Sequence, residues 1–459
     1  MSKRILIVAA EFPPVKGIGR LRPLKFCQHL QALGWECAVL TVEIGDVAPI
    51  DLETLKEIPL GVQVYRARLP KPKAFLVEQV KKILRRPITQ SSHTSTISTA
   101  AQPADEPLRP LGGMIEKAMA WWDHIAKHYV LIPDDLLLWK RSAVHRGLEA
   151  IASFRPDVIL ATAPCFTDLL VGHALSARAG VPWVADYRDL WTGDVLREWV
   201  PKWRQVLELA LERHVLHSAS AILAVSEPKT RVLSNRLGGG DRFYTLTNGY
   251  DEDEFDAVTP EVTMNGPIRV VYAGRLFKNR RGYEIMEAVG ELVADRPDLK
   301  RAIRFEYYGG IEPEIKKTID EMLDHFSIRE AFHFSPDVPY ARSKALQKGA
   351  DALLLIVDSG ETSSGVIPGK LFEYMAAGQP ILCIATPGAT TDIIERGGLG
   401  WSVAPGDIQS LQGILRSWLD SGRPAVRPNR AYLQQFERSS IVTRLSEVLS
   451  GVIVSDRRS

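Results

Sequence analysis

The chain has 459 residues, which is too long for one ordinary hydrophobic core, so we expect two domains. Its composition, 45% hydrophobic and 24% charged, is that of a globular protein in water, and a formal net charge of +2 argues against a nucleic-acid binder. No stretch has the length and hydropathy of a transmembrane helix, and the apolar run at the N-terminus is too short for a signal peptide, so we expect a cytoplasmic protein.

The first half of the sequence alternates apolar runs with segments of helical periodicity. We expect strands at residues 4–10, 36–42, 62–68, 157–163, 182–188, 221–226 and 243–249. We expect helices at residues 22–34, 142–154, 167–179 and 204–216, and one that begins near residue 228. Such alternation is typical of a parallel sheet with helices on both faces.

Residues 71–130 interrupt this alternation. Residues 71–87 carry six basic residues against one acidic residue, and their apolar positions have helical spacing. The polar residues 89–107 are expected to be disordered, and residues 112–130 place Trp121, Trp122 and Tyr129 on one helical face. A basic amphipathic helix beside a Trp-rich helix favours docking on an anionic membrane surface. The alternative is an insertion that covers the core of the first domain.

The strand and helix pattern then restarts. We expect strands at 268–275, 304–310, 331–336, 350–357 and 380–386, with helices between them. The predicted fold class is therefore α/β, with two doubly wound, Rossmann-like domains that face a central cleft. We place the first domain at residues 1–256, a linker at 257–267, the second domain at 268–430, and a C-terminal helix that packs back on the first domain at 431–459.

The loop after the first predicted strand, EFPPVKGIGR, contains Gly17 and Gly19. These glycines can let backbone N–H groups approach a ligand at the start of the next helix. A tight turn explains the pair equally well. The loop lacks the third glycine of the dinucleotide fingerprint, and no acidic residue clearly ends the second strand, so the pattern counts against a dinucleotide-dependent oxidoreductase.

A basic loop follows the first strand of the second domain. Arg275, Lys278, Arg280 and Arg281 lie within seven residues of each other, at the carboxyl end of a strand and just before a helix. This placement suits a diphosphate, and a solvated surface loop is the alternative. Gly309 closes another strand and allows a flat ring or another chain to approach closely.

The third candidate is the stretch GVIPGKLFEYMAAGQPILC, which reads as a loop, a short helix and a strand. The helix N-terminus after Gly365 can bind phosphate oxygens, and Lys370 adds positive charge. Glu373 lies further along the helix, where a carboxylate that faces a cleft can accept hydrogen bonds from a ribose diol. A glutamate that simply faces water is the alternative.

No metal-binding constellation is found in the sequence. The four cysteines are scattered singly, which favours reduced and mostly buried thiols; they are Cys27, Cys37, Cys165 and Cys383. The acidic run at residues 251–255 is expected to turn the chain between the domains.

Taken in order along nearly the whole chain, these motifs resemble the retaining GT-B glycosyltransferases of family 4, especially those of bacterial surface-polysaccharide pathways. The segments that carry the resemblance are FPPVKGIGRLRPLKF, RPDVILATAPCFTDLLVG, GVPWVADYRDLW, AVSEP, LTNGYDEDEF, YAGRL and PGKLFEYMAAGQPIL. The resemblance implies a nucleotide-sugar donor bound mainly by the second domain and an acceptor bound mainly by the first.

Carried over by position, the resemblance makes Arg275, with Arg280 or Arg281, the clamp for the donor diphosphate, and Lys278 a further member. Glu373 resembles the carboxylate that holds the ribose hydroxyls. Gly17 and Gly19 resemble the glycine loop beside the phosphates and the transferred sugar.

This sequence departs from the family pattern in two places. Many members have a glutamate where this chain has Gly365, and nearby Glu361 is not at the matching position. Many members also have a histidine near the strand end that holds Asp186, Arg188 and Asp189 here. We predict that Asp186 or Arg188 faces the acceptor or the sugar and that either, with Arg275, is a catalytic residue. A structural Asp–Arg pair at this strand end is the alternative.

The resemblance implies sugar transfer with retention, in surface-polysaccharide synthesis and without a metal or other cofactor. The basic insertion fits a lipid-linked acceptor at the cytoplasmic face of the membrane, and a soluble acceptor is the alternative. Two alternatives share the architecture, namely a nucleotide-sugar 2-epimerase and a non-catalytic sugar-nucleotide binder.

Overall fold

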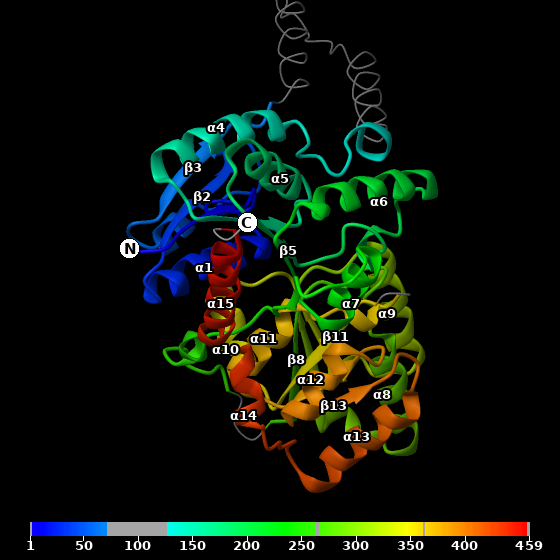
Figure 1. Ribbon diagram of the computed structural model, residues 1–459. Coiled ribbons are helices and arrows are strands. Elements are labelled where there is room, and N and C mark those ends of the chain that lie inside the picture. Colours follow the sequence, from blue (N-terminus) through cyan, green and yellow to red (C-terminus); the bar gives the residue numbers. More distant parts are fainter. Residues whose placement is uncertain (1, 71–125, 263–265, 361–362, 457–459) are drawn as a thin grey trace, which may run out of the picture.

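The computed structural model describes residues 2–70, 126–262, 266–360 and 363–456. Within these residues the chain forms two α/β domains, each built on one parallel sheet that has helices on both faces (Figure 1). The prediction of two doubly wound, Rossmann-like domains is therefore confirmed.

The sheet of the first domain has seven parallel strands in the order β3-β2-β1-β4-β5-β6-β7. The order reverses at β1, which pairs with β2 on one side and β4 on the other, and ligands of such sheets bind at the carboxyl ends of strands near a reversal. The strands are β1 (Arg4–Val8), β2 (Glu36–Val42), β3 (Gln63–Ala67), β4 (Val158–Ala163), β5 (Trp183–Tyr187), β6 (Ala221–Ala224) and β7 (Phe243–Thr245).

Helices cover both faces of this sheet. The helices α4 and α5 bury apolar side chains against one face, and α1 packs on the other. Gly180 ends α5 in the left-handed conformation, with φ of 66°, which is a common end for a helix. The helices are α1 (Leu21–Ala32), α4 (Trp139–Phe154), α5 (Thr167–Ala179), α6 (Lys202–His217) and α7 (Glu227–Arg236).

The second domain repeats this plan with six parallel strands in the order β10-β9-β8-β11-β12-β13. The strands are β8 (Ile268–Ala273), β9 (Ile303–Tyr308), β10 (Phe332–Ser335), β11 (Ala352–Ile356), β12 (Ile381–Ile384) and β13 (Gly400–Val403). The helices are α8 (Tyr283–Asp295), α9 (Pro313–His325), α10 (Tyr340–Lys348), α11 (Gly369–Ala377), α12 (Ala389–Gly397) and α13 (Ile408–Ser421). The helices α8, α9 and α13 bury one face of the sheet, and α10, α11 and α12 bury the other.

The chain passes between the domains twice at the same place. After the short helix α14 (Arg430–Leu433), Phe436 and Arg438 form backbone hydrogen bonds with Tyr250, which lies on the outgoing segment. A Cβ on Gly249 would lie 2.4 Å from the carbonyl oxygen of Phe436, so the two segments can cross this closely only because residue 249 is glycine.

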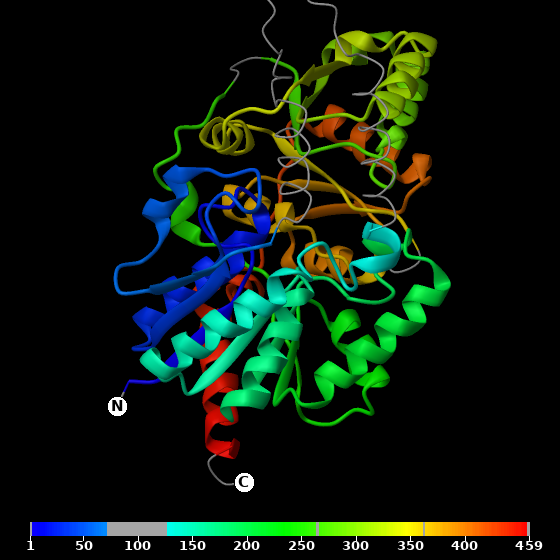
Figure 2. The ribbon, with the colours of Figure 1, turned by 90° about the horizontal axis from the view of Figure 1, so that it is seen from above.

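The last helix, α15 (Arg438–Asp456), then runs beside α1 and completes the core of the first domain (Figures 1 and 2). Ile441, Leu445 and Leu449 on this helix are buried together with apolar residues of α1 and β1. The C-terminal helix therefore holds the second domain to the first.

Most of the predicted insertion at residues 71–130 lies outside the described residues. None of the helices that the structure describes combines the length and the hydropathy needed to cross a membrane. The four cysteines are free thiols, and Cys165 is the one that is not fully buried.

Candidate functional site

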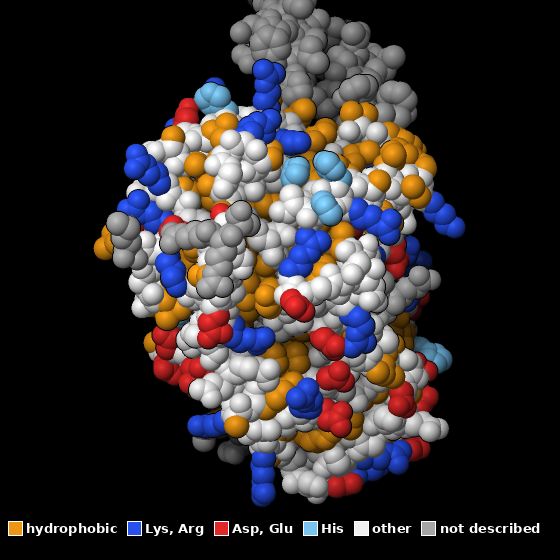
Figure 3. Space-filling view, in the orientation of Figure 1, with side chains coloured by type: hydrophobic (Ala, Val, Ile, Leu, Met, Phe, Trp, Pro, Cys, Tyr) orange, Lys and Arg blue, Asp and Glu red, His pale blue; other side chains and the backbone are white. Residues whose placement is uncertain are grey.

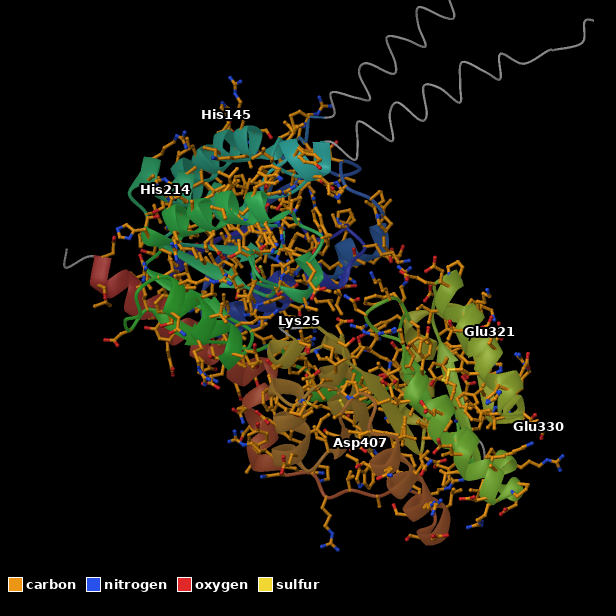
Figure 4. The ribbon with its side chains drawn as sticks, turned by 90° about the vertical axis from the view of Figure 1, so that its right-hand side faces the viewer. Lys25, His145, His214, Glu321, Glu330 and Asp407 are labelled. Atoms are coloured by element: carbon orange, nitrogen blue, oxygen red, sulfur yellow. The ribbon has the colours of Figure 1, made fainter. Side chains whose placement is uncertain are left out.

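A cavity of about 1230 Å³ lies between the two domains, where the loops at the carboxyl ends of both sheets face one another. The first domain lines it with the loop after β1, the start of α1 and the loop after β5, and the second with the end of β8 and the start of α11. Lys25 of α1, labelled in Figure 4, belongs to this lining and lies at the border between the domains. The cavity is large enough for a nucleotide and a sugar together.

The structure brings half of the sequence-predicted site residues to the wall of this cavity. They are Gly19, Arg188, Arg275, Arg280, Lys370 and Glu373. The others lie close by in the chain but do not line the cavity, and they are Gly17, Asp186, Lys278, Arg281, Gly309 and Gly365. In each predicted loop, therefore, only some of the named residues line the cavity.

In the basic loop, Arg275 is the residue whose side chain stays exposed at the cavity wall. Within the described part of the chain, its guanidinium has neither an ion pair nor a hydrogen bond. Arg281 instead lies over the ring of Tyr283, 5.7 Å from the ring centre, and the backbone N–H of Lys278 donates to the carboxylate of Glu312 at 3.2 Å. Arg275 is thus the arginine of this loop that is available to an anionic ligand.

Arg280 also faces the cavity, but an internal partner holds it. Its Nε and Nη2 atoms donate to the two carboxylate oxygens of Asp358, at 3.1 and 2.8 Å. Burial would lower the pKa of Arg280, but the charge of Asp358 outweighs this effect and raises it, so the guanidinium stays charged. Asp358 therefore fixes the orientation of Arg280 at the end of β11, where the sequence showed no sign of a partner.

Tyr272 lines the cavity together with these two arginines. Its hydroxyl donates a hydrogen bond of 2.9 Å to the backbone oxygen of Arg275, which fixes the backbone of the basic loop. Burial raises the pKa of Tyr272 to about 12, so this hydroxyl remains protonated and keeps donating at neutral pH.

The helix α11 presents a charged pair to the cavity. Lys370 Nζ lies 2.7 Å from Glu373 Oε2, and Gln347 of α10 also approaches that oxygen, at 3.5 Å. The side chains of Lys370 and Glu373 remain 29% and 14% exposed, so both can be reached from the cavity. The carboxylate of Glu373 is held in place with its second oxygen, Oε1, available to accept hydrogen bonds.

On the opposite wall, Arg188 fixes the glycine loop. Its Nη1 donates to the backbone oxygen of Gly19 at 2.6 Å and lies 3.7 Å from the carboxylate of Glu11, and Nη2 donates to the backbone oxygen of Pro164. A Cβ on Gly19 would lie 1.5 Å from Glu11 Oε2, so the loop leaves room for a carboxylate that the sequence analysis did not single out. Glu11 and Arg188 form a polar pair on the first-domain side of the cavity.

The prediction that Asp186 faces the acceptor or the sugar is not supported by its surroundings. Asp186 is fully buried, and its carboxylate accepts hydrogen bonds from Arg22 at 2.7 and 2.9 Å and from Thr162 at 2.7 Å. Arg22 also donates to the backbone oxygens of Leu246 and Thr247. The structural Asp–Arg pair considered in the sequence analysis therefore exists, but Asp186 forms it with Arg22 of α1.

Two glycines make close contacts within the protein. Gly309 has φ of +147°, and a Cβ there would lie 2.1 Å from the backbone oxygen of Gly274, so this glycine lets the ends of β8 and β9 approach each other. The backbone oxygen of Gly365 accepts a hydrogen bond of 2.7 Å from Ser226, which lies just before α7 in the other domain. Both residues support the site from outside the cavity.

A second ionic cluster lies at the edge of the cavity, where the C-terminal helix packs on the first domain. Asp251 accepts from Lys25 at 2.7 Å, from His29 at 3.1 Å and from Arg438 at 2.7 Å, and Glu254 accepts from the same arginine at 2.7 Å. Burial would raise the pKa of Asp251, but the hydrogen bond from His29 and the charges of Arg438 and Lys25 outweigh it and hold this pKa well below its usual range. The acidic run predicted to turn the chain thus forms ion pairs as well.

Among the described residues, no group of three or more histidine, cysteine or acidic side chains is arranged to hold a metal ion. Glu361, considered as a substitute for a missing glutamate, lies outside the described residues.

Two glycosyltransferase family models match the chain, one in each half. The model for glycosyl transferases group 1 matches residues 257–435, and the model for glycosyltransferase family 4 matches residues 89–254, so that the two together take in most of the chain. No curated protein sequence matches the chain significantly.

Solved structures share the fold at low sequence identity. HepE from Anabaena in complex with UDP has 14% identity and a TM-score of 0.59, covering 98% of this chain and 100% of the other. Sucrose-phosphate synthase from Thermosynechococcus elongatus has 13% identity and a TM-score of 0.61, covering 99% and 100%. The lipopolysaccharide outer core galactosyltransferase WaaB in its apo form has 13% identity and a TM-score of 0.58, covering 98% and 99%.

Proposed function

Because the chain belongs to the GT-B glycosyltransferases of the family 4 type, we propose that it transfers a sugar from a nucleoside diphosphate sugar to an acceptor with retention of configuration. The observation that carries this proposal is the arrangement around the cavity. Arg275 and Lys370 place positive charge beside Glu373 on the second-domain wall, and Glu11 with Arg188 faces them from the first domain.

Each group has a role in this proposal. Arg275 binds the diphosphate and stabilises the charge that grows on it as the bond to the sugar breaks, and the N-terminus of α11 contributes N–H groups. Glu373 accepts hydrogen bonds from the ribose hydroxyls. The Glu11–Arg188 pair lies where the acceptor binds. The complexes of HepE with UDP and with UDP-glucose support a donor of this class.

We further propose that the acceptor is lipid-linked and that the product is a surface polysaccharide or glycoconjugate. The basic residues 71–87 and the Trp-rich residues that follow them support this part of the proposal, because both suit an anionic lipid surface.

The donor site can be tested by thermal-shift titration of the full chain with UDP, GDP, ADP, CMP and NAD. We expect one nucleoside diphosphate to stabilise the protein selectively. The variant Glu373→Ala should lower the affinity for that nucleotide about tenfold. Glu321→Ala is the matched control, because Glu321 is an exposed glutamate on α9, far from the cavity lining (Figure 4).

A dideoxy analogue of the same nucleotide sharpens this test. If Glu373 holds the ribose, the analogue binds wild type and Glu373→Ala equally, because the hydroxyls that the carboxylate would bind are missing. Stabilisation by NAD alone, or an equal effect of Glu373→Ala and Glu321→Ala, would contradict the proposal.

A further inference from the structure

In helix α6, charged side chains are buried and large apolar side chains are exposed, which is the reverse of an ordinary surface helix. Its charged residues Arg204, Glu208 and Glu212 are each only 1% exposed, whereas Val206 is 68% exposed and Leu207 is 53% exposed. Surface helices of globular proteins usually bury the apolar stripe and expose the charged one. The reversal needs an explanation on both faces of the helix.

The buried face of α6 makes several ion pairs and hydrogen bonds. Glu208 accepts from Arg197 at 2.6 Å and from Trp191 at 3.1 Å, and it also pairs with Arg204. Glu212 accepts from Thr192 at 2.7 Å. These contacts fix the loop between β5 and α6, and they leave the apolar stripe pointing outward.

The exposed stripe is part of a larger apolar patch, which we call the α6 face. It consists of Tyr129, Trp199, Trp203, Val206 and Leu207, each of which is 42% or more exposed. Tyr129 stacks on Trp203 with ring centres 5.8 Å apart. Figure 3 shows hydrophobic side chains gathered over α6 at the upper right of the molecule. Contiguous exposed patches of this kind mark interaction surfaces.

The charges around the α6 face favour an anionic partner. Both glutamates of α6 are buried, and Lys202 and Arg213 are exposed on the helix, whereas Glu198, directly before Trp199, is an exposed acidic residue. Exposed tryptophan and tyrosine beside basic residues are typical of the membrane interface.

We infer that the α6 face docks the protein on an anionic lipid surface. Leu196 lines the cavity between the domains, and Trp199 of the α6 face lies three residues further along the same loop, so one loop joins the cavity to the docked surface. A lipid-linked acceptor could then reach the cleft without leaving the membrane, and this last step rests on the proposed function. The docking itself does not.

Vesicle co-sedimentation of the full chain tests the inference. We expect binding to vesicles of roughly one part phosphatidylglycerol to two parts phosphatidylcholine, little binding to phosphatidylcholine alone, and weakening by salt. The double variant Val206→Ser/Leu207→Ser should bind about tenfold less. The control is Leu52→Ser/Leu60→Ser, which replaces two apolar residues that are 57% and 98% exposed elsewhere on the first domain.

A charge variant separates the electrostatic contribution to vesicle binding from the apolar one. Lys202→Glu/Arg213→Glu should lower binding to the anionic vesicles severalfold while leaving nucleotide-induced thermal shifts unchanged, because neither residue lines the cavity. Wild-type binding by the Val206/Leu207 variant, or equal binding of wild type to both vesicle types, would overturn the inference. It would also be overturned if the α6 face proved to be a dimer contact that the same variant abolishes in sedimentation. Failure to bind any nucleotide would count against the proposed function alone.

Discussion

Arg280 and Asp358 form a two-point ion pair at the wall of the cleft, with Nε–Oδ1 and Nη2–Oδ2 distances of 3.1 and 2.8 Å. Asp358 is only 4% exposed, so it cannot exchange its partner for water. Arg275, five positions earlier, is exposed and has no such partner among the described residues. The two arginines of one basic loop therefore differ in role, and the difference can be measured.

Replacing Arg280 should mainly destabilise the protein. Arg280→Ala leaves the buried carboxylate of Asp358 without its partner, and we expect the free energy of unfolding in urea to fall by about 2–4 kcal/mol. The double variant Arg280→Ala/Asp358→Asn should recover part of this loss, because the uncompensated charge is removed. If the double variant were as unstable as the single one, the ion pair would not be the cause.

Replacing Arg275 should instead reduce turnover. Arg275→Ala is expected to lower kcat/KM for the donor by about 10- to 100-fold, because a charged hydrogen bond to the diphosphate is lost and the charge to be stabilised grows during reaction. The Tm should stay close to that of wild type. Arg281→Ala is the matched control, since Arg281 belongs to the same loop but lies over Tyr283 outside the cavity lining. Equal kinetics for the two variants would exclude Arg275 from the donor site.

The ionic cluster around Asp251 should make stability depend on acid pH. The pKa of Glu254 is also lowered, because Arg438 and Lys25 outweigh the effect of burial. A carboxyl group with a lowered folded pKa contributes stability above its unfolded pKa, which is 3.8 for aspartate and 4.5 for glutamate here, and loses it as the pH falls toward the folded pKa.

We therefore expect urea unfolding of wild type to show a falling free energy of unfolding below about pH 4.5, by up to about 2 kcal/mol from this cluster. The variant Asp251→Asn/Glu254→Gln should be less stable than wild type at pH 7. Its free energy of unfolding should also fall less steeply as the pH drops below about 4.5. Asp253→Asn is the control, because no ion pair of Asp253 is found within the described part of the chain. If the free energy of unfolding of the double variant fell as steeply with acid as that of wild type, other groups would be responsible for the acid sensitivity.

The sequence was sufficient to predict the two sheets and several of the loops that line the cavity, because long apolar runs and strand-end glycines are local signals. It did not identify Asp358 or Glu11, because each acts through a partner that is distant in the chain. It also could not assign Asp186, since a buried Asp–Arg pair and a ligand-facing aspartate have the same local sequence. Only the contact with Arg22, 164 positions away, distinguishes them.

Helix α6 is a second case in which contacts distant in the chain decide what the local sequence cannot. The sequence predicts a helix at residues 204–216, but it does not show which side of that helix faces the core. That choice depends on Arg197 and Thr192, which pair with the glutamates of the helix from a loop whose path the sequence does not reveal.

Replacing two glycines of the predicted site by alanine should have different effects: Gly309→Ala should lower stability, whereas Gly19→Ala should lower turnover. In Gly309→Ala, the new Cβ would lie 2.1 Å from the backbone oxygen of Gly274 in a conformation with φ of +147°. Backbone atoms cannot move away easily, so we expect a loss of about 2 kcal/mol or more in the free energy of unfolding.

In Gly19→Ala, the new Cβ would instead meet Glu11 Oε2 and Arg188 Nη1, which are the ends of flexible side chains and can move aside. Stability should change by less than about 1 kcal/mol, but the Glu11–Arg188 pair must shift at the first-domain wall of the cleft. If this pair positions the acceptor, kcat should fall about tenfold or more while nucleotide affinity stays the same. An unchanged kcat in a stable Gly19→Ala variant would show that the pair only shapes the loop.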